Sequence, residues 1–319
     1  MLLKIASQCF LILALVLFAS LSANAVTITE FSTGITPFSV PEGIATGSDG
    51  NLWFTEFGNR IGQITPAGII TEFAAGITGT GPDGITAGPD GNLWFTELDS
   101  DIIGRITPAG VITEFSAGIT AGGGLYRITS GPDGNLWFTE FNIDKVGRIT
   151  PAGLVTEFSA GITSGSGPAD ITAGPDGNLW FTEPNGNAIG RITTSGSVSE
   201  FSVAITSGSF PYGITAGPDG NLWFTETGGS MVGRITPTGV VTGFSSGITS
   251  GSGPAGITAG PDGNLWFTES SGNRIGRISQ LMPPTATNVP TMTEWGMITF
   301  MMLAGLGSVF YLRRQRKDP

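Results

Sequence analysis

The sequence lacks histidine altogether, has one cysteine and has few charged residues. Histidine is the commonest general base near neutral pH and the commonest metal ligand, so any catalysis must use carboxylates, hydroxyls or basic side chains. Cys9 lies in an apolar N-terminal segment, which excludes disulfides and thiolate chemistry from the remaining chain. Charged residues make up 12% of the 319 positions and glycine fills 51, a composition typical of short strands joined by glycine turns.

Acidic residues outnumber basic residues by 25 to 14, which gives a formal net charge of −11. Four of the basic residues lie among the last seven positions, so the rest of the chain is still more acidic. An acidic surface repels phosphate groups, and we therefore expect no nucleic-acid partner.

The N-terminus has the pattern of a signal peptide. Lys4 precedes an apolar run from Phe10 to Leu21, and Ala23-Asn24-Ala25 is the small-residue sequence that signal peptidase cleaves. The pattern predicts that residues 1–25 are removed on export and that the mature chain begins near Val26.

One repeat dominates the next 255 positions, from residue 26 to residue 280. The string NLWFTE occurs six times, and its tryptophans are spaced by 41 and then 43 residues. The six tryptophans are Trp53, Trp94, Trp137, Trp180, Trp223 and Trp266. A period of this length indicates a repeat architecture.

Each repeat contains four extended pieces, for example Ile171–Ala173, Leu179–Thr182, Ile189–Thr193 and Val198–Phe201. These pieces are rich in Val, Ile, Thr, Trp and Phe, and Gly, Pro, Asp or Asn bounds them, as in a strand. Four strands make one blade of a β-propeller. The prediction is an all-β, six-bladed propeller of four-stranded blades over residues 26–280.

The two ends of the repeat region complement each other. Ile28-Thr29-Glu30-Phe31 has the sequence of a fourth strand with no first three strands before it. The last repeat stops after its third strand, Ile275-Gly276-Arg277-Ile278. We therefore expect the N-terminal strand to complete the sixth blade, which closes the ring and removes an open sheet edge.

The C-terminal region has the order of a sorting signal. After a Pro/Thr linker at 281–288, residues 289–319 hold Val289-Pro290-Thr291-Met292, an uncharged segment at 295–312 and a basic end. This order resembles the IPTL-type C-terminal sorting signals of Gram-negative bacteria, and the resemblance implies a transmembrane helix and an envelope sorting machinery as partner. An ordinary single-span membrane anchor is the alternative interpretation.

The repeats themselves, GPDGNLWFTE followed by IGRITPAG, closely resemble the virginiamycin B lyase family over residues 26–280. The resemblance implies a propeller, seven-bladed in the family, that linearises cyclic streptogramins by elimination at an ester. It also implies a magnesium ion, acidic ligands and a catalytic histidine 14 residues before a WFTE glutamate. The residues at that place in this chain are Glu42, Asp83, Tyr126, Ala169, Tyr212 and Ala255, so the histidine has no counterpart.

Two sets of residues are candidates for a site. The WFTE glutamates end their strands at one face, where a ring of carboxylates would suit Mg²⁺ or Ca²⁺; they are Glu56, Glu97, Glu140, Glu183, Glu226 and Glu269. The alternative is that each glutamate pairs with an arginine in phase with the repeats: Arg105, Arg148, Arg191, Arg234 or Arg277, with Gln63 in the first repeat.

The second set breaks the repeat pattern near the mouth of the channel, on the face with the variable loops. We expect these residues to bind a ligand; they are Glu42, Asp83, Tyr126, Arg127, Asp170 and Tyr212. Neutral drift between duplicated copies would produce the same differences, and this alternative stays open.

The leading hypothesis is therefore an exported, envelope-sorted propeller that binds a glycan, peptide or partner protein without catalysis. It would lie in the cell envelope or outside the cell, at least transiently anchored in the inner membrane. One alternative is a metal-assisted lyase for cyclic depsipeptides that uses Glu and Tyr in place of histidine. A second alternative is a structural matrix protein.

Overall fold

The computed structural model of the protein describes residues 30–279. The predicted signal peptide, linker, sorting tail and transmembrane segment lie outside these residues and stay predictions. The chain divides into two compact units, Met1–Thr33 and Gly34–Pro319, and all the strands described here belong to the second. Within the described residues there is no helix long and apolar enough to cross a membrane.

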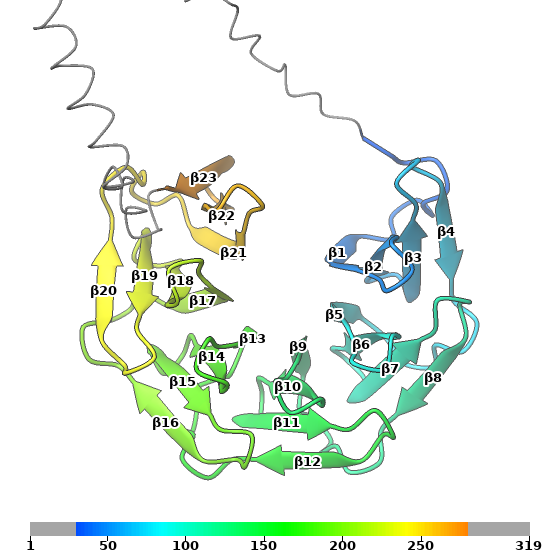
Figure 1. The fold of residues 1–319 in the computed structure, drawn as a ribbon, viewed down its shortest axis with the longest axis horizontal. Helices are drawn as coiled ribbons and strands as arrows, with labels where there is room; N and C mark the ends of the chain where they lie inside the picture. The colour runs from blue at the N-terminus through cyan, green and yellow to red at the C-terminus, as the bar shows by residue number, and fades with distance from the viewer. Residues whose placement is uncertain (1–29, 280–319) are drawn as a thin grey trace, which may run out of the picture. The chain divides into compact units, whose positions relative to one another are not determined.

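All regular structure in the described residues is β-strand, as predicted (Figure 1). The first three blades comprise β1 (Pro41–Thr46), β2 (Leu52–Glu56), β3 (Arg60–Ile64), β4 (Ile70–Phe73); β5 (Pro82–Ala87), β6 (Leu93–Glu97), β7 (Ile102–Ile106), β8 (Ile112–Phe115); and β9 (Leu125–Ser130), β10 (Leu136–Glu140), β11 (Lys145–Ile149), β12 (Val155–Phe158). The last three comprise β13 (Ile171–Ala173), β14 (Leu179–Glu183), β15 (Ala188–Ile192), β16 (Val198–Phe201); β17 (Pro211–Ala216), β18 (Leu222–Glu226), β19 (Met231–Ile235), β20 (Val241–Phe244); and β21 (Pro254–Ala259), β22 (Leu265–Glu269), β23 (Arg274–Ile278).

Every blade is an antiparallel sheet in which strands pair in chain order. Five sheets have four strands, and the sixth has three in the described residues, β21, β22 and β23. The six-bladed propeller is thus confirmed. The predicted closing strand is not confirmed. Ile28 and Thr29 lie outside the described residues, and Glu30 and Phe31 belong to no strand. Closure therefore stays a prediction.

The turn between the first two strands of each blade is held by its aspartate. In blade two, the indole Nε1 of Trp94 donates to Oδ1 of Asp90 at 3.0 Å, and the side-chain amide of Asn92 donates to Oδ2 at 2.8 Å. Gly91 has a φ of 78°, a conformation that suits glycine. The GPDGNLW motif therefore fixes both the turn and the tryptophan that follows it.

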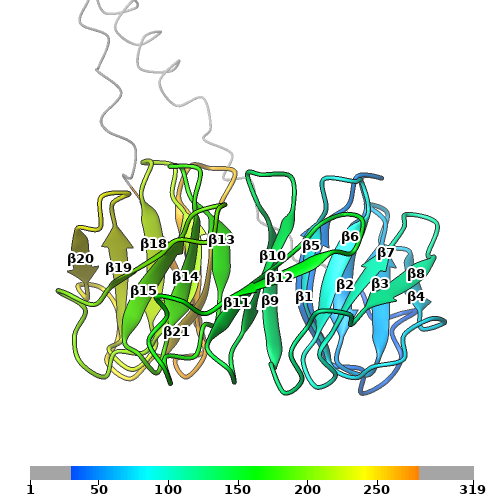
Figure 2. The same ribbon diagram turned by 90° about the horizontal axis from the view of Figure 1, so that it is seen from below.

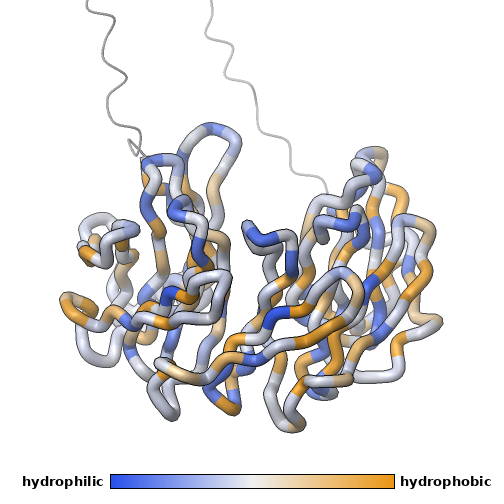
Figure 3. Tube along the Cα trace, turned by 60° about the horizontal axis from the view of Figure 1, so that its bottom comes forward, coloured by the Kyte–Doolittle hydropathy of each residue, from blue (hydrophilic) through white to orange (hydrophobic). Residues whose placement is uncertain are grey.

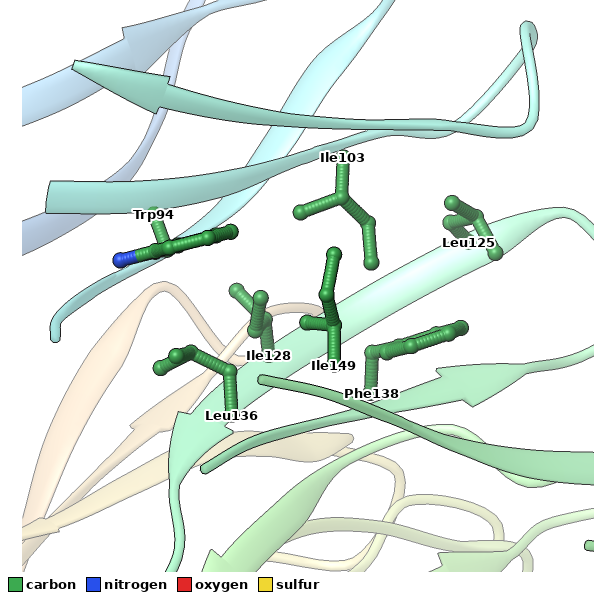
Figure 4. Close-up of a cluster of buried hydrophobic side chains, with 7 residues drawn as sticks. All are labelled: Trp94, Ile103, Leu125, Ile128, Leu136, Phe138 and Ile149. Carbon is green, nitrogen blue, oxygen red and sulfur yellow. The ribbon is translucent and has the colours of Figure 1, made fainter. Parts of the chain in front are cut away.

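The core lies between the blades, because LWFTE presents apolar side chains on both faces of its strand. Figure 4 shows Trp94 and Ile103 of blade two packed against Leu136, Phe138 and their neighbours in blade three. Trp94 also stacks on Phe115 of its own fourth strand, with ring centroids 5.3 Å apart. Hydrophobic and hydrophilic segments are accordingly mixed over the whole trace in Figure 3 rather than gathered on one side of it.

A threonine hydroxyl links each blade to the next. The hydroxyl of Thr139 accepts from the backbone N–H of Arg127 at 3.1 Å and donates to the carbonyl of Ala169, in blade four, at 2.6 Å. The WFTE threonines of the first five blades all make this bond to the next blade. The repeat thus joins the inner strands through buried hydroxyls as well as through apolar contacts.

Candidate functional site

Connections alternate between the two faces of the propeller because neighbouring strands are antiparallel (Figure 2). The Pro-Asp-Gly and Pro-Ala-Gly turns share one face. The loops after the WFTE strings, which differ between blades, share the other; we call this the variable face. The segments that lead into each inner strand also lie on the variable face, so the first residues of the inner strands end there.

Four of the predicted ligand residues lie at β-bulges of the inner strands, next to the variable face. The register with the second strand shifts between Pro82 and Ile85, and again between Pro211 and Ile214. Asp83 and Tyr212 lie in these shifts, while Tyr126 and Arg127 lie in the corresponding shift of β9. A bulge redirects side chains away from the regular alternation, and this geometry places residues of blades two, three and five near one another.

The structure brings together five of the six predicted ligand residues; we call Asp83, Tyr126, Arg127, Asp170 and Tyr212 the central cluster. Arg127 forms an ion pair with Asp83 of the neighbouring blade. Asp170 accepts the backbone N–H of Ile171 at 2.9 Å and, across blades, that of Ile214 at 2.8 Å. Opposite charges and hydrogen bonds therefore connect blades two to five.

Two tyrosines meet within the central cluster although a whole blade separates them in the chain. The hydroxyls of Tyr126 and Tyr212 are 2.5 Å apart, and their rings meet edge to face with centroids 6.3 Å apart. Blade four places the small side chain of Ala169 at the same repeat position, which leaves room for this contact. The guanidinium of Arg127 lies 5.0 Å from the centre of the Tyr126 ring.

Burial governs the ionisation of the central cluster. It raises the pKa of Asp83 and that of Asp170, although the nearby Arg127 charge partly offsets the rise in both. Burial followed by the Tyr212 hydroxyl raises the pKa of Tyr126 above its usual value. Tyr126 is therefore neutral at physiological pH, where it acts as a hydrogen-bond partner and not as a general base.

Glu42 is the predicted ligand residue that the structure leaves outside the central cluster. It lies on the exposed strand β1, and within residues 30–279 its side chain makes no hydrogen bond or ion pair.

Two aromatic residues near the variable face were not predicted as ligand residues. Phe141 packs against Tyr126 with ring centroids 5.9 Å apart, and Phe210, 49% exposed, has a φ of 52°.

Phe210 could have been singled out from the sequence, because it replaces a glycine of the repeat. Four repeats have glycine at its position, and all four adopt positive φ; they are Gly81, Gly124, Gly167 and Gly253. A phenylalanine in this conformation is strained, as is Val40, which holds the same position in blade one with a φ of 53°. Phe141, in a variable loop, had no such marker.

The six WFTE glutamates are buried at the ends of their own strands, 0–6% exposed. Burial and then a neighbouring fourth-strand glutamate raise the pKa of Glu97 and of Glu140 to about 8; Glu183 reaches the same value through burial and Glu200, against the Ser166 hydrogen bond. Within residues 30–279 no group of three or more acidic side chains is placed to hold a metal ion. The predicted Mg²⁺ or Ca²⁺ ring therefore gains no support from the geometry.

The alternative prediction, that each glutamate pairs with an in-phase arginine, is wrong. Hairpin register sets Arg105 opposite Trp94, three residues from the glutamate, and its guanidinium lies 5.5 Å from the indole centre. Arg105 also lies 3.8 Å from Asp90 of the turn and donates to the carbonyl of Pro151 in the next blade. The repeated arginines thus support the tryptophans and the blade contacts.

The comparisons agree with this architecture. The sequence matches the virginiamycin B lyase family over residues 19–123 and 119–294. It is 40% identical to a streptogramin B lyase of known structure, covering 79% of this chain and 83% of that one, with a TM-score of 0.73. No curated protein matches the sequence.

Two structures from Staphylococcus aureus are also similar, each 42% identical over 77% of this chain. One is a selenomethionine-substituted virginiamycin B lyase; the match covers 82% of that chain, with a TM-score of 0.71. The other is a catalytically inactive histidine-to-alanine variant of virginiamycin B lyase with quinupristin; the match covers 84% of that chain, with a TM-score of 0.73. The chain belongs to the virginiamycin B lyase family.

Proposed function

We propose that this protein is an exported, envelope-sorted propeller that binds an aromatic-bearing peptide ligand at the central cluster, without histidine-dependent elimination. The observation that carries the proposal is the central cluster itself, assembled from four blades by residues that each break the repeat. The chain has no histidine, and replacing one histidine by alanine leaves a related lyase catalytically inactive. Export and sorting rest on the sequence of residues 1–25 and 289–319.

The chemistry of the central cluster favours a peptide. The edge-to-face tyrosines, with Phe141 beside Tyr126, offer aromatic faces to apolar rings. Arg127 and the tyrosine hydroxyls offer donors to carbonyl groups. Asp83 and Asp170 flank the guanidinium, so the cluster does not present a strong positive charge to an anion. A neutral ligand with carbonyls and aromatic rings suits this arrangement.

The test uses the full-length chain and quinupristin, the cyclic depsipeptide with which a relative is described. Calorimetry should show saturable binding, and chromatography should show that the ring stays closed. Tyr212→Phe and Arg127→Gln should each weaken binding about tenfold, because each removes a partly buried hydrogen-bonding group. Thr238→Ala, in an exposed turn on the opposite face, is the matched control and should bind as the unaltered chain does.

Two results would overturn the proposal. If quinupristin does not bind, or if Tyr212→Phe and Thr238→Ala bind alike, the central cluster is not a site for this class of ligand. If the ring opens during incubation, the protein is a lyase that works without histidine. Export is tested separately: the purified chain should begin at Val26, and a chain that retains residues 1–25 would contradict it.

A further inference from the structure

The carboxyl groups on the two faces of the propeller differ in their surroundings. On the face of the Pro-Asp-Gly turns, aspartates lie near arginines: Arg105 is 3.8 Å from Asp90, and Arg148 is 3.9 Å from Asp133. On the variable face, the glutamate that ends the second strand lies within hydrogen-bonding reach of a fourth-strand glutamate in each of blades one to four. The fourth-strand glutamates are Glu72, Glu114, Glu157 and Glu200. Within residues 30–279 the variable face therefore carries four such carboxyl pairs.

Blades three and one neutralise their pair with a cation of the same blade. In blade three, the ammonium of Lys145 donates to Oε2 of Glu157 at 2.6 Å and to the Thr120 hydroxyl at 2.8 Å. In blade one, Nε of Arg60 lies 3.3 Å from Oε2 of Glu72. Both cations come from the first residue of the third strand, which lies beside the fourth strand at the variable face. The repeat thus has a built position for one side-chain cation.

Blades two and four have the same acceptors without the cation. Their third strands begin with Ile102 and Ala188, where β11 begins with Lys145. The fourth-strand glutamate of each blade accepts from a threonine hydroxyl at 2.6 Å, and no Lys or Arg within residues 30–279 forms an ion pair with it. We call Glu97, Glu114 and Thr78 the blade-two site, and Glu183, Glu200 and Thr163 the blade-four site. Each is an acidic site that the described part of the chain leaves without a counterion.

The second-strand glutamate of each site is buried. Glu97 and Glu183 are 0% exposed; within the described residues neither carboxylate oxygen of Glu97 has a hydrogen-bond partner, and one oxygen of Glu183 has none. In blade three, burial raises the pKa of Glu140, and the nearby Lys145 charge partly offsets the rise. Burial followed by Glu114 raises the pKa of Glu97 without such an offset from a basic side chain. A cation beside these carboxyl groups would relieve an unfavourable charge arrangement.

We infer that the blade-two and blade-four sites bind lysine side chains of a basic polypeptide. An ammonium already occupies the corresponding place in blade three, whereas Ile102 and Ala188 carry no charge and are shorter than lysine. An ammonium needs only a few oxygen acceptors, whereas Ca²⁺ takes about six to eight. Because no group of three or more acidic side chains within the described residues is placed to hold a metal ion, the sites suit an ammonium better.

The placement of the sites favours a polypeptide over a small amine. Strands β8 and β16, which carry Glu114 and Glu200, lie on the outer rim with blade three between them (Figure 1). One small amine cannot occupy two sites that a whole blade separates, whereas lysines along one chain can. The formal net charge of −11 and the loop carboxylate of Asp144, whose charge acts on Glu183, add a potential that attracts a basic partner.

The first test supplies each site with a lysine of its own blade. Ile102→Lys combined with Ala188→Lys repeats the arrangement of blade three, and circular dichroism with the melting temperature checks that the variant is folded. Fluorescence anisotropy of labelled tetralysine with the full-length chain should show saturable binding, which this double variant weakens about tenfold or more. Ala152→Lys combined with Thr238→Lys adds the same charge in exposed turns of the opposite face and should weaken binding by less than about threefold.

A second variant removes the charge of the acceptors, which keeps the test decisive if the lysine variant does not fold. Glu114→Gln combined with Glu200→Gln preserves the size of both side chains and should weaken tetralysine binding by a similar factor. Tetralysine with acetylated side chains should not bind the unaltered chain, because acetylation removes the ammonium charge.

Three results would overturn the inference. If tetralysine does not bind, the sites do not take ammonium groups. If the opposite-face lysines weaken binding as much as Ile102→Lys with Ala188→Lys does, only the net charge attracts the peptide. If Ca²⁺ at the same concentration displaces tetralysine, the sites hold a metal ion. None of these readouts involves quinupristin or the central cluster, so the result is independent of the proposed function.

Discussion

Blade three and blade six share the string GPDGNLWFTE and the third-strand residues Gly-Arg-Ile, but they differ in burial. Trp137 and Val146 of blade three have no exposed surface, whereas Ile275, the counterpart of Val146, is 66% exposed. Blade three has a neighbour on both faces and its own fourth strand; blade six has one packed neighbour and three strands in the described residues. In a repeat protein, stability is thus a property of the interfaces between units, which a single unit cannot supply.

The central cluster lies in blades two to five. These blades differ from one another in the loops of the variable face and around the first residues of their inner strands, where the five residues of the cluster lie. The threonine hydroxyls and the tryptophan stacks, which do not vary, fix the positions of those bulges. Constant residues therefore build the frame, and exceptions among the repeated positions form the central cluster.

The largest expected effect is that of pH on stability, because the blades that have a neighbour on both faces bury carboxyl groups. The folded-state pKa of Glu97, Glu140 and Glu183 is about 8, above the ordinary 4.5, so the folded chain holds protons that the unfolded chain releases. The stability they contribute is complete below pH 4.5 and is lost as pH rises to about 8. Each group that is fully engaged changes the free energy of unfolding by about 1.4 kcal/mol per pH unit.

Melting temperatures from pH 5 to pH 9 at constant ionic strength measure this effect. Glu183→Gln should flatten the decline, since the amide stays neutral throughout. The turn aspartates Asp90 and Asp133 do not interfere, because side-chain hydrogen bonds lower their pKa despite partial burial and they titrate below this range. Stability that is constant or that rises between pH 5 and pH 8 would contradict the assignment of these glutamates as buried acids.

The strands, the turns and the apolar packing on both faces of each blade were predictable, because the same residue pattern occurs six times in the sequence. The members of the central cluster were predictable because they interrupt that repeat. Their contacts were not: whether Tyr126 reaches Tyr212 depends on the curvature of the blades and on the small Ala169 between them. The partner of Arg105 was predicted wrongly. Arg105 recurs in phase with both Glu97 and Trp94, and only the register of the hairpin shows that it lies opposite Trp94.

The second largest effect on stability is expected from the loss of an aromatic side chain that is buried between two blades. Trp137→Ala should lower the free energy of unfolding by about 3–5 kcal/mol, since it opens a cavity among fully buried side chains. Urea denaturation measures this change. Phe38→Ala, at a side chain that is 99% exposed, is the control and should change stability by less than about 0.5 kcal/mol.

Trp266→Ala then sharpens the comparison between the blades. If residues 28–31 complete blade six, this substitution should cost about as much as Trp137→Ala. A much smaller cost would mean that blade six remains open at its edge. A small cost for Trp137→Ala itself would contradict the assignment of the blade interfaces as the core.

The smallest of the three effects tests the hydroxyl link between blades. Thr139→Val keeps the shape of the side chain but leaves the N–H of Arg127 and the carbonyl of Ala169 without their partner, at a cost of about 1–3 kcal/mol. Thr156→Val, on the outer strand of the same blade, is the matched control, because no hydrogen bond of the Thr156 hydroxyl occurs within residues 30–279. Equal costs for the two substitutions in urea denaturation would mean that apolar packing alone joins the blades. A larger cost for Thr139→Val would mean that the hydroxyls hold the bulge of Arg127, and with it the central cluster, at a fixed position relative to blade four.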